Sequence, residues 1–142
     1  MHVALAFVGL PCPLPLLADA VRAGFPSPAD DFVERAIDLN DLLIRNRPAT
    51  FLVRVDGDSM REKGLSDGDL AVVDRSVEPA NGDVVVVDVD GNRSFKVWAV
   101  KGGRIWLSFA NHAYPVYPMP DEACIEVWGV VVGSVNPRRR AA

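Results

Sequence analysis

Residues 50–135 carry a pattern of hydrophobic and polar positions that is typical of β-strands separated by tight turns. Short runs rich in valine and aromatic residues alternate with clusters of aspartate, asparagine and glycine, which tend to end strands. Turn sequences such as those at residues 90–92 and 102–103 join neighbouring strands, so we expect a mainly β, mostly antiparallel sheet. The expected strands span residues 50–56, 69–74, 83–89, 94–100, 104–109 and 125–135.

The segment before these strands predicts two short helices. Ser27 can cap a helix, and Pro28 suits the first helical position. Two aspartates follow, where the helix dipole favours negative charge. Apolar residues then recur with helical spacing at Phe32, Val33, Ala36 and Ile37. A second helix is expected over residues 40–45.

The chain begins with a largely apolar run over residues 3–17. No lysine or arginine precedes this run, and Pro11, Pro13 and Pro15 would break the helix of a secretory signal sequence. The run is also too short to span a membrane. We expect instead an extended N-terminal arm whose apolar side chains pack on the body of the protein or on a second copy.

Composition and charge narrow the functional classes. Hydrophobic residues make up 49% of the 142 residues and charged residues 24%, which fits one globular domain and not a disordered chain. The net charge of -4 argues against a general DNA-binding surface, apart from a short basic run at residues 138–140. Cys12 and Cys124 have neither metal-ligand nor disulfide-framework spacing, so we expect a cytoplasmic protein with free thiols, no metal and no cofactor.

Ser59 and Lys96 are candidates for a catalytic pair. Ser59 follows Gly57 and Asp58 at the end of an expected strand, where a turn would expose its hydroxyl group. That hydroxyl is a weak nucleophile until a base removes its proton, and a lysine can be that base only when burial keeps its amine neutral. Lys96 lies in an apolar strand and is one of three lysines beside twelve arginines, which cannot lose their proton in proteins. The structural alternative is that Ser59 caps a turn and Lys96 reaches water from an edge strand.

The same pattern assigns roles to the neighbours of this pair. The backbone N–H groups of Asp58 and Ser59 lie where a turn leaves them free to hold an oxyanion. The Asp58 carboxylate should point away from Lys96, because a negative charge beside the lysine would raise its pKa. The apolar walls around the lysine are expected to be Val85, Val87 and Trp98.

The wider sequence around these residues carries a family resemblance. The stretches concerned are residues 55–60, 64–70, 82–86, 90–91 and 128–131, together with Lys96. They resemble the LexA/UmuD family of self-cleaving Ser-Lys peptidases. Upstream, Ala23-Gly24 with residues 25–31 looks like the cleavage-site segment of the UmuD branch, and residues 37–44 follow as they do there. The resemblance covers residues 20–135.

The resemblance implies a fold and an activity. The fold would be a twisted, β-barrel-like antiparallel peptidase domain with short N-terminal helices and an extended arm. Ser59 and Lys96 would cut the bond between Ala23 and Gly24 of the chain itself. Residues 1–23 would then be an arm removed by self-cleavage, and residues 24–142 the peptidase-like domain.

The resemblance also implies partners, which place the protein in the SOS response to DNA damage. A RecA–single-stranded DNA filament would stimulate cleavage, and the processed protein, a homodimer, would join the catalytic subunit of an error-prone Y-family translesion polymerase. LexA-type repressors carry a DNA-binding domain, for which the residues before the cut are too few. The UmuD-type role is therefore expected, without sequence-specific DNA binding and without a membrane.

Three alternatives stay open at this point. A signal-peptidase-like processing enzyme would need a membrane anchor, which the sequence does not show. A non-catalytic module would use the sheet only for dimerisation and polymerase docking. An antirepressor-like regulator could be built on the same fold.

Overall fold

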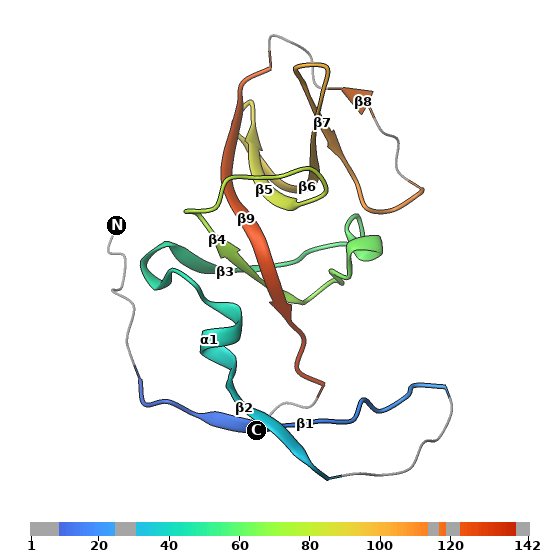
Figure 1. The fold of residues 1–142 in the computed structure, drawn as a ribbon. Coiled ribbons are helices and arrows are strands. Elements are labelled where there is room, and N and C mark those ends of the chain that lie inside the picture. The colour runs from blue at the N-terminus through green and yellow to red at the C-terminus, as the bar shows by residue number, and fades with distance from the viewer. Residues whose placement is uncertain (1–8, 25–30, 114–116, 119–122, 139–142) are drawn as a thin grey trace. The chain divides into compact units, whose positions relative to one another are not determined.

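The computed structural model describes residues 9–24, 31–113, 117–118 and 123–138. The chain separates into two compact units, Met1–Arg45 and Asn46–Ala142, where the sequence predicted a single domain (Figure 1). The cut expected after Ala23 lies inside the first unit, and that boundary stays a prediction. Within the described residues, no helix is long and apolar enough to cross a membrane.

The first unit is a two-stranded antiparallel sheet followed by a short helix. Strand β1 (Pro13–Leu17) pairs with β2 (Val33–Asp38), and helix α1 (Leu39–Leu43) follows directly. The extended arm is thus confirmed over β1, and its prolines fit an edge strand, which needs no ladder hydrogen bond from every residue. Helix α1 confirms the second expected helix, and its N-terminus is capped by Asp38, whose Oδ1 accepts from Asn40 N at 2.9 Å.

The first expected helix is wrong where the structure describes it. The apolar stripe from Phe32 to Ile37 predicts a helix, but Val33–Asp38 is strand β2. Pairing with β1 makes this segment a strand, because Leu14 lies opposite Ile37 and Ala18 N donates to Phe32 O at 2.7 Å. Ladder contacts with a distant segment override a local helical preference. The expected helix start at Ser27 and Pro28 lies outside the described residues.

The second unit is one antiparallel sheet with the strand order β3-β4-β9-β5-β6-β7-β8. Its mainly β, antiparallel character is confirmed, and each of the six expected strands is present within about two residues of its expected ends. The observed bounds are β3 (Thr50–Arg54), β4 (Leu70–Asp74), β5 (Val84–Val89), β6 (Asn92–Lys101), β7 (Arg104–Ser108), β8 (Tyr117–Pro118) and β9 (Ile125–Val135), with 3₁₀ helices η1 (Arg47–Ala49) and η2 (Arg61–Lys63). Strand β9 runs between β4 and β5 (Figure 1), although it comes last in the chain.

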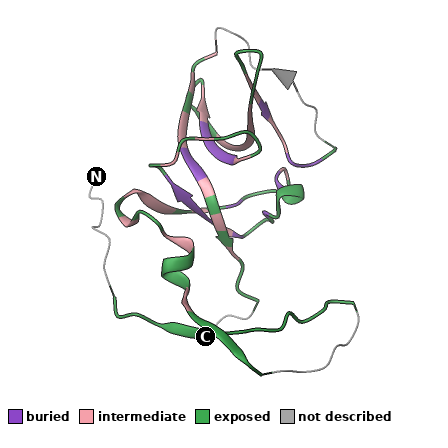
Figure 2. Ribbon diagram, in the orientation of Figure 1, coloured by how far each residue is buried: buried purple, intermediate pink, exposed green. Residues whose placement is uncertain are grey.

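The core of the second unit lies on both faces of β5. Val84 and Val86 belong to a cluster with Met60 and Val73, while the alternate residues Val85 and Val87 pack around Leu107 and Val130. Figure 2 shows buried residues along β4 and β5. Because successive side chains of a strand point to opposite faces, one valine run fills both clusters.

Candidate functional site

The turn that carries Ser59 is shaped by glycine and anchored by Met60. Gly57 has φ of 93°, a left-handed conformation that favours glycine, and its N–H donates to Asp67 Oδ1 at 2.8 Å. The turn leads into η2, as expected for a serine that opens a turn or short helix. Met60 is 1% exposed and belongs to the core cluster with Val73, so the residue after Ser59 fixes the turn to the sheet. Ser59 itself stays partly exposed.

Lys96 lies on β6 opposite Val85, and its amine is partly buried. The amine Nζ donates to Ser94 Oγ at 2.9 Å and to the carbonyl of Phe95 at 3.3 Å, and it lies 4.3 Å from the ring centroid of Phe109. Burial lowers the pKa of Lys96 below its ordinary value of 10.5, because desolvation disfavours the charged amine. Within the described residues no carboxylate forms an ion pair with Nζ, so nothing there counters this shift.

Ser59 and Lys96 line the same cleft, which has a volume of about 400 Å³. Both apolar and charged residues line the cleft. The remaining lining residues are Val53, Val86, Phe95 and Phe109, with Arg54, Asp56, Arg93 and Ser94. Two residues far apart in sequence therefore line one cleft, and their pairing as nucleophile and base stays a prediction. The described chain contains no hydrogen bond between Ser59 Oγ and Lys96 Nζ, which bonds to Ser94 instead.

The residues expected to form apolar walls around the lysine lie together in one hydrophobic cluster. Val85, Val87 and Trp98 belong to the cluster around Leu107 and do not line the cleft. The apolar lining comes instead from Val53 of β3, from Val86 and Phe95 on the same two strands as the expected residues, and from Phe109 after β7. Alternation along one strand identifies the residues that share a face with Lys96, but not the neighbours that its long side chain reaches.

Arg93 lines the cleft and forms an ion pair with Asp88, which does not line it. Arg93 forms a bidentate ion pair with Asp88, with Nε–Oδ1 at 2.8 Å and Nη2–Oδ2 at 3.0 Å. This hydrogen bonding raises the pKa of Arg93 and lowers the pKa of Asp88. Asp58, expected to point away from the lysine, does not line the cleft, whereas Asp56 does.

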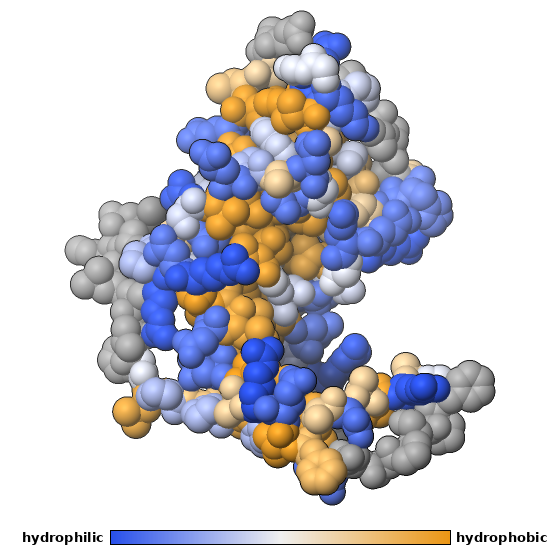
Figure 3. Space-filling view, in the orientation of Figure 1, coloured by the Kyte–Doolittle hydropathy of each residue, from blue (hydrophilic) through white to orange (hydrophobic). Residues whose placement is uncertain are grey.

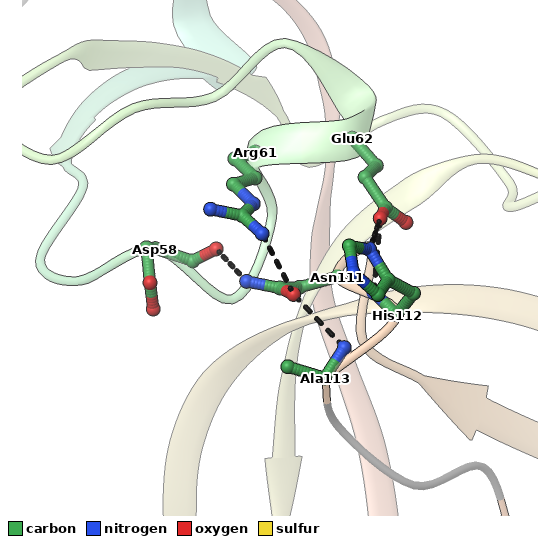
Figure 4. A network of polar contacts seen from close by, with 6 residues as sticks. All are labelled: Asp58, Arg61, Glu62, Asn111, His112 and Ala113. Atoms are coloured by element: carbon green, nitrogen blue, oxygen red, sulfur yellow. Dashed lines mark hydrogen bonds and ion pairs between the residues drawn. The ribbon is translucent and has the colours of Figure 1, made fainter.

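A network of polar contacts joins the serine turn to the residues after β7 (Figure 4). Asn111 Nδ2 donates to the carbonyl of Asp58 at 3.1 Å. Outside the residues drawn there, Glu62 N donates to the carbonyl of Ala110 at 2.7 Å. His112 also contacts Glu62, with Nδ1 2.6 Å from Oε1. Sequence analysis missed Asn111, because no local pattern reveals a contact across 53 residues.

The backbone groups of Asp58 and Ser59 are the oxyanion donors expected from the sequence, and their hydrogen bonds differ. The N–H of Ser59 has no hydrogen-bond acceptor among the described residues, which leaves it available to a substrate. The carbonyl of Asp58 accepts from Asn111 and from Arg61 N at 3.3 Å. Assignment of the Asp58 and Ser59 N–H groups to an oxyanion hole stays a prediction.

The expected cleavage site lies in the first unit. Ala23 and Gly24 are exposed and lie outside the strands, and a Cβ added to Gly24 would meet nothing within 4 Å. Cys12 and Cys124 are exposed and free. Over the part of the chain that the structure describes, no group of three histidine, cysteine or acidic side chains is placed to hold a metal ion.

Comparison with known proteins finds one matching family model and several similar bacterial proteins. The model of the Peptidase S24-like family matches residues 15–132. The chain is 44% identical to Protein SamA of Salmonella typhimurium over 125 residues, which is 88% of this chain and 86% of that protein. It is 35% identical to Protein MucA of Escherichia coli over 123 residues, 86% of this chain and 84% of that protein. Protein ImpA of Escherichia coli is 48% identical over 82 residues, 58% of this chain and 57% of that protein.

These matches cover most of the chain, including the serine turn and the strand of Lys96. The class is therefore that of the serine peptidases and their relatives. Within it, the chain belongs to the Peptidase S24-like family, in the LexA/UmuD group.

The lowered pKa of Lys96 predicts a pH dependence of stability. Its pKa is lower folded than unfolded, so between the folded value and 10.5 the unfolded chain binds more protons. The free energy of unfolding should therefore rise with pH across this window, and the cost of burying the charge is complete below it. Lys96→Met removes this contribution, so its stability relative to the unsubstituted protein should fall as pH rises.

The measurement is urea unfolding from pH 7 to pH 10, a range chosen for the assay, in a Ser59→Ala background that prevents cleavage. Lys101→Met is the matched control, because Lys101 is an exposed lysine at the end of the same strand. If Lys96→Met and Lys101→Met show the same pH slope, the buried amine of Lys96 does not titrate as described.

Proposed function

We propose that this chain is a self-cleaving serine endopeptidase in which Ser59 is the nucleophile and Lys96 the general base. One observation carries the proposal: the two residues line one cleft, and burial lowers the pKa of Lys96. Membership of the Peptidase S24-like family supports serine peptidase chemistry.

The contacts of Lys96 fit the role of a base. A neutral amine has two N–H donors and one lone pair. The bonds to Ser94 Oγ and to the Phe95 carbonyl use both donors, which leaves the lone pair to accept the proton of Ser59. Ser94 thereby holds the amine in place.

The reaction then follows from ordinary acyl transfer. Ser59 Oγ attacks the carbonyl carbon of Ala23 while Lys96 takes the hydroxyl proton, and backbone N–H groups of Asp58 and Ser59 hold the oxyanion. The ammonium of Lys96 returns the proton to the nitrogen of Gly24 as the peptide bond breaks. Water, deprotonated by the same amine, hydrolyses the ester and releases residues 1–23. Presentation of the bond by the chain itself supplies a high effective concentration.

The biological role proposed here rests on the family. A RecA–single-stranded DNA filament would stimulate cleavage during the SOS response, and the processed protein would serve in the cytoplasm as accessory subunit of a Y-family translesion polymerase. The likeness to SamA and MucA over most of the chain supports this UmuD-type role.

A second candidate function is a non-catalytic docking module. One observation favours it: Lys96 Nζ bonds to Ser94 Oγ and not to Ser59 Oγ.

The first prediction from this function concerns the product. Incubation with a RecA filament should yield a fragment that starts at Gly24, because a small residue followed by glycine suits a narrow cleft. Gly24→Trp should block cutting, whereas Gly9→Trp, at another glycine with open space around it, should not. Intact-mass spectrometry gives the answer, and a new N-terminus elsewhere would refute the assigned bond.

The second prediction concerns the base. Without a filament, self-cleavage should accelerate as pH rises and level off above the lowered pKa of Lys96, because only the neutral amine accepts a proton. Ser59→Ala and Lys96→Ala should abolish cleavage, and Lys96→Arg should do so too, since guanidinium cannot act as a base. Lys63→Arg is the control and should cut normally. Substantial activity of Lys96→Arg would transfer support to the docking module.

The third prediction is a homodimer in solution. The first unit exposes apolar side chains (Figure 3): Leu14 is 50% exposed, Leu17 45% and Val33 57%. A two-stranded sheet alone is marginally stable in water, so a second copy that covers these residues would stabilise it. Light scattering at tens of micromolar, a concentration chosen for the assay, should report twice the chain mass. A monomer there would contradict the proposal.

A further inference from the structure

We propose that Asn111 is a positioning residue of the active site, which holds the carbonyl of Asp58 and thereby directs the N–H of Ser59 toward the oxyanion. The inference rests on the self-cleavage proposed above. It assigns a role in catalysis to a side chain that does not line the cleft.

Asn111 is buried and its amide group has a defined orientation. The residue is 3% exposed, and its Nδ2 donates to the Asp58 carbonyl at 3.1 Å (Figure 4). Its Oδ1 accepts from Ala113 N at 3.1 Å and from Arg61 Nη2 at 3.5 Å. A backbone N–H only donates and a carbonyl only accepts, so exchanging the amide's oxygen and nitrogen would oppose like groups at both contacts.

The Asp58–Ser59 peptide converts this contact into an orientation of the Ser59 N–H. The peptide is a planar trans unit, so its C=O and N–H point in opposite directions. Because the C=O points to Asn111, the N–H points away from Asn111. Ser59 lines the cleft, and its N–H has no acceptor among the described residues. An unoccupied donor held at that place is what a developing oxyanion requires.

A side-chain contact between the same segments, beside the backbone bond from Glu62 N to the Ala110 carbonyl, is exposed. Glu62 Oε1 accepts from His112 N at 2.9 Å and lies 2.6 Å from His112 Nδ1, with side chains 46% and 80% exposed. Water competes for such a contact, so it holds the Asp58 peptide less firmly than the buried amide does. Glu62→Gln, which keeps an acceptor oxygen for His112 N, is therefore a matched control.

The test is Asn111→Asp, assayed by filament-free self-cleavage as a function of pH. The substitution keeps an oxygen for Ala113 N and Arg61, and it replaces the side-chain donor to Asp58 with a second carboxylate oxygen. We expect cleavage on the order of 100-fold slower than in the unsubstituted protein, the loss that a misplaced reacting group can cause. Glu62→Gln should change the rate by less than about twofold, because the contact it alters is exposed.

The pH profile separates positioning from a general loss of structure. At lower pH the introduced carboxyl group is protonated and can donate to the Asp58 carbonyl, so the rate relative to the unsubstituted protein should recover as pH falls. Asn111→Ala removes the donor without adding charge. It should lower the rate at every pH and leave the pH midpoint of the profile unchanged, since Lys96 is untouched.

Each other outcome overturns the inference. If the unsubstituted protein does not cleave, the proposed function fails and the inference with it. If it cleaves and the folded Asn111 variants cleave equally fast, only the inference fails. A shifted pH midpoint in Asn111→Ala would mean an effect through Lys96. Circular dichroism that reports both variants unfolded would assign Asn111 to the fold and not to the site.

Discussion

The burial of β5 on both faces is the constraint on which the second unit depends. Val85 and Val87 are completely buried, and Val86 is 2% exposed on the opposite face. The side chains on the two faces pack into separate hydrophobic clusters, one containing Met60 and the other Leu107. Strand β5 also pairs with β9 on one side and with β6, which carries Lys96, on the other. Because Met60 anchors the serine turn in one of these clusters, the packing of β5 sets the separation of Ser59 and Lys96.

The proposed chemistry of the cleft uses the amine of Lys96, and burying this amine lowers the stability of the fold. An amine withdrawn from water loses hydration, and the lowered pKa of Lys96 is the direct sign of that loss. Its bonds to Ser94 and to the Phe95 carbonyl compensate in part. The buried oxygen Asp69 Oδ1 also has no hydrogen-bond partner in the described residues. Both groups lie near the serine turn in sequence or in space, where a rigid sheet is needed to hold unfavourable groups in place.

The first unit shows how pairing can override local signals. Its residues 33–38 carry a helical stripe, yet they form β2, because β1 offers a partner strand at a distance in sequence that no local pattern registers. The helix that follows begins where local capping and the end of strand pairing coincide, because Asp38 is the last residue of β2 and caps α1. Local preference therefore succeeded at the capped terminus and failed where a ladder was available.

The sequence by itself determined the strands of the second unit, the turn that presents Ser59 and the strand that carries Lys96. These follow from valine alternation, from glycine and aspartate in turns, and from the rarity of lysine, all of which act over a few residues. Only the tertiary structure decided that β9 lies between β4 and β5, that Phe109 and Val53 line the cleft, and that Asn111 reaches Asp58. Each of these contacts joins segments far apart in the chain, and their geometry is set by packing of the whole sheet, which no short window of sequence contains.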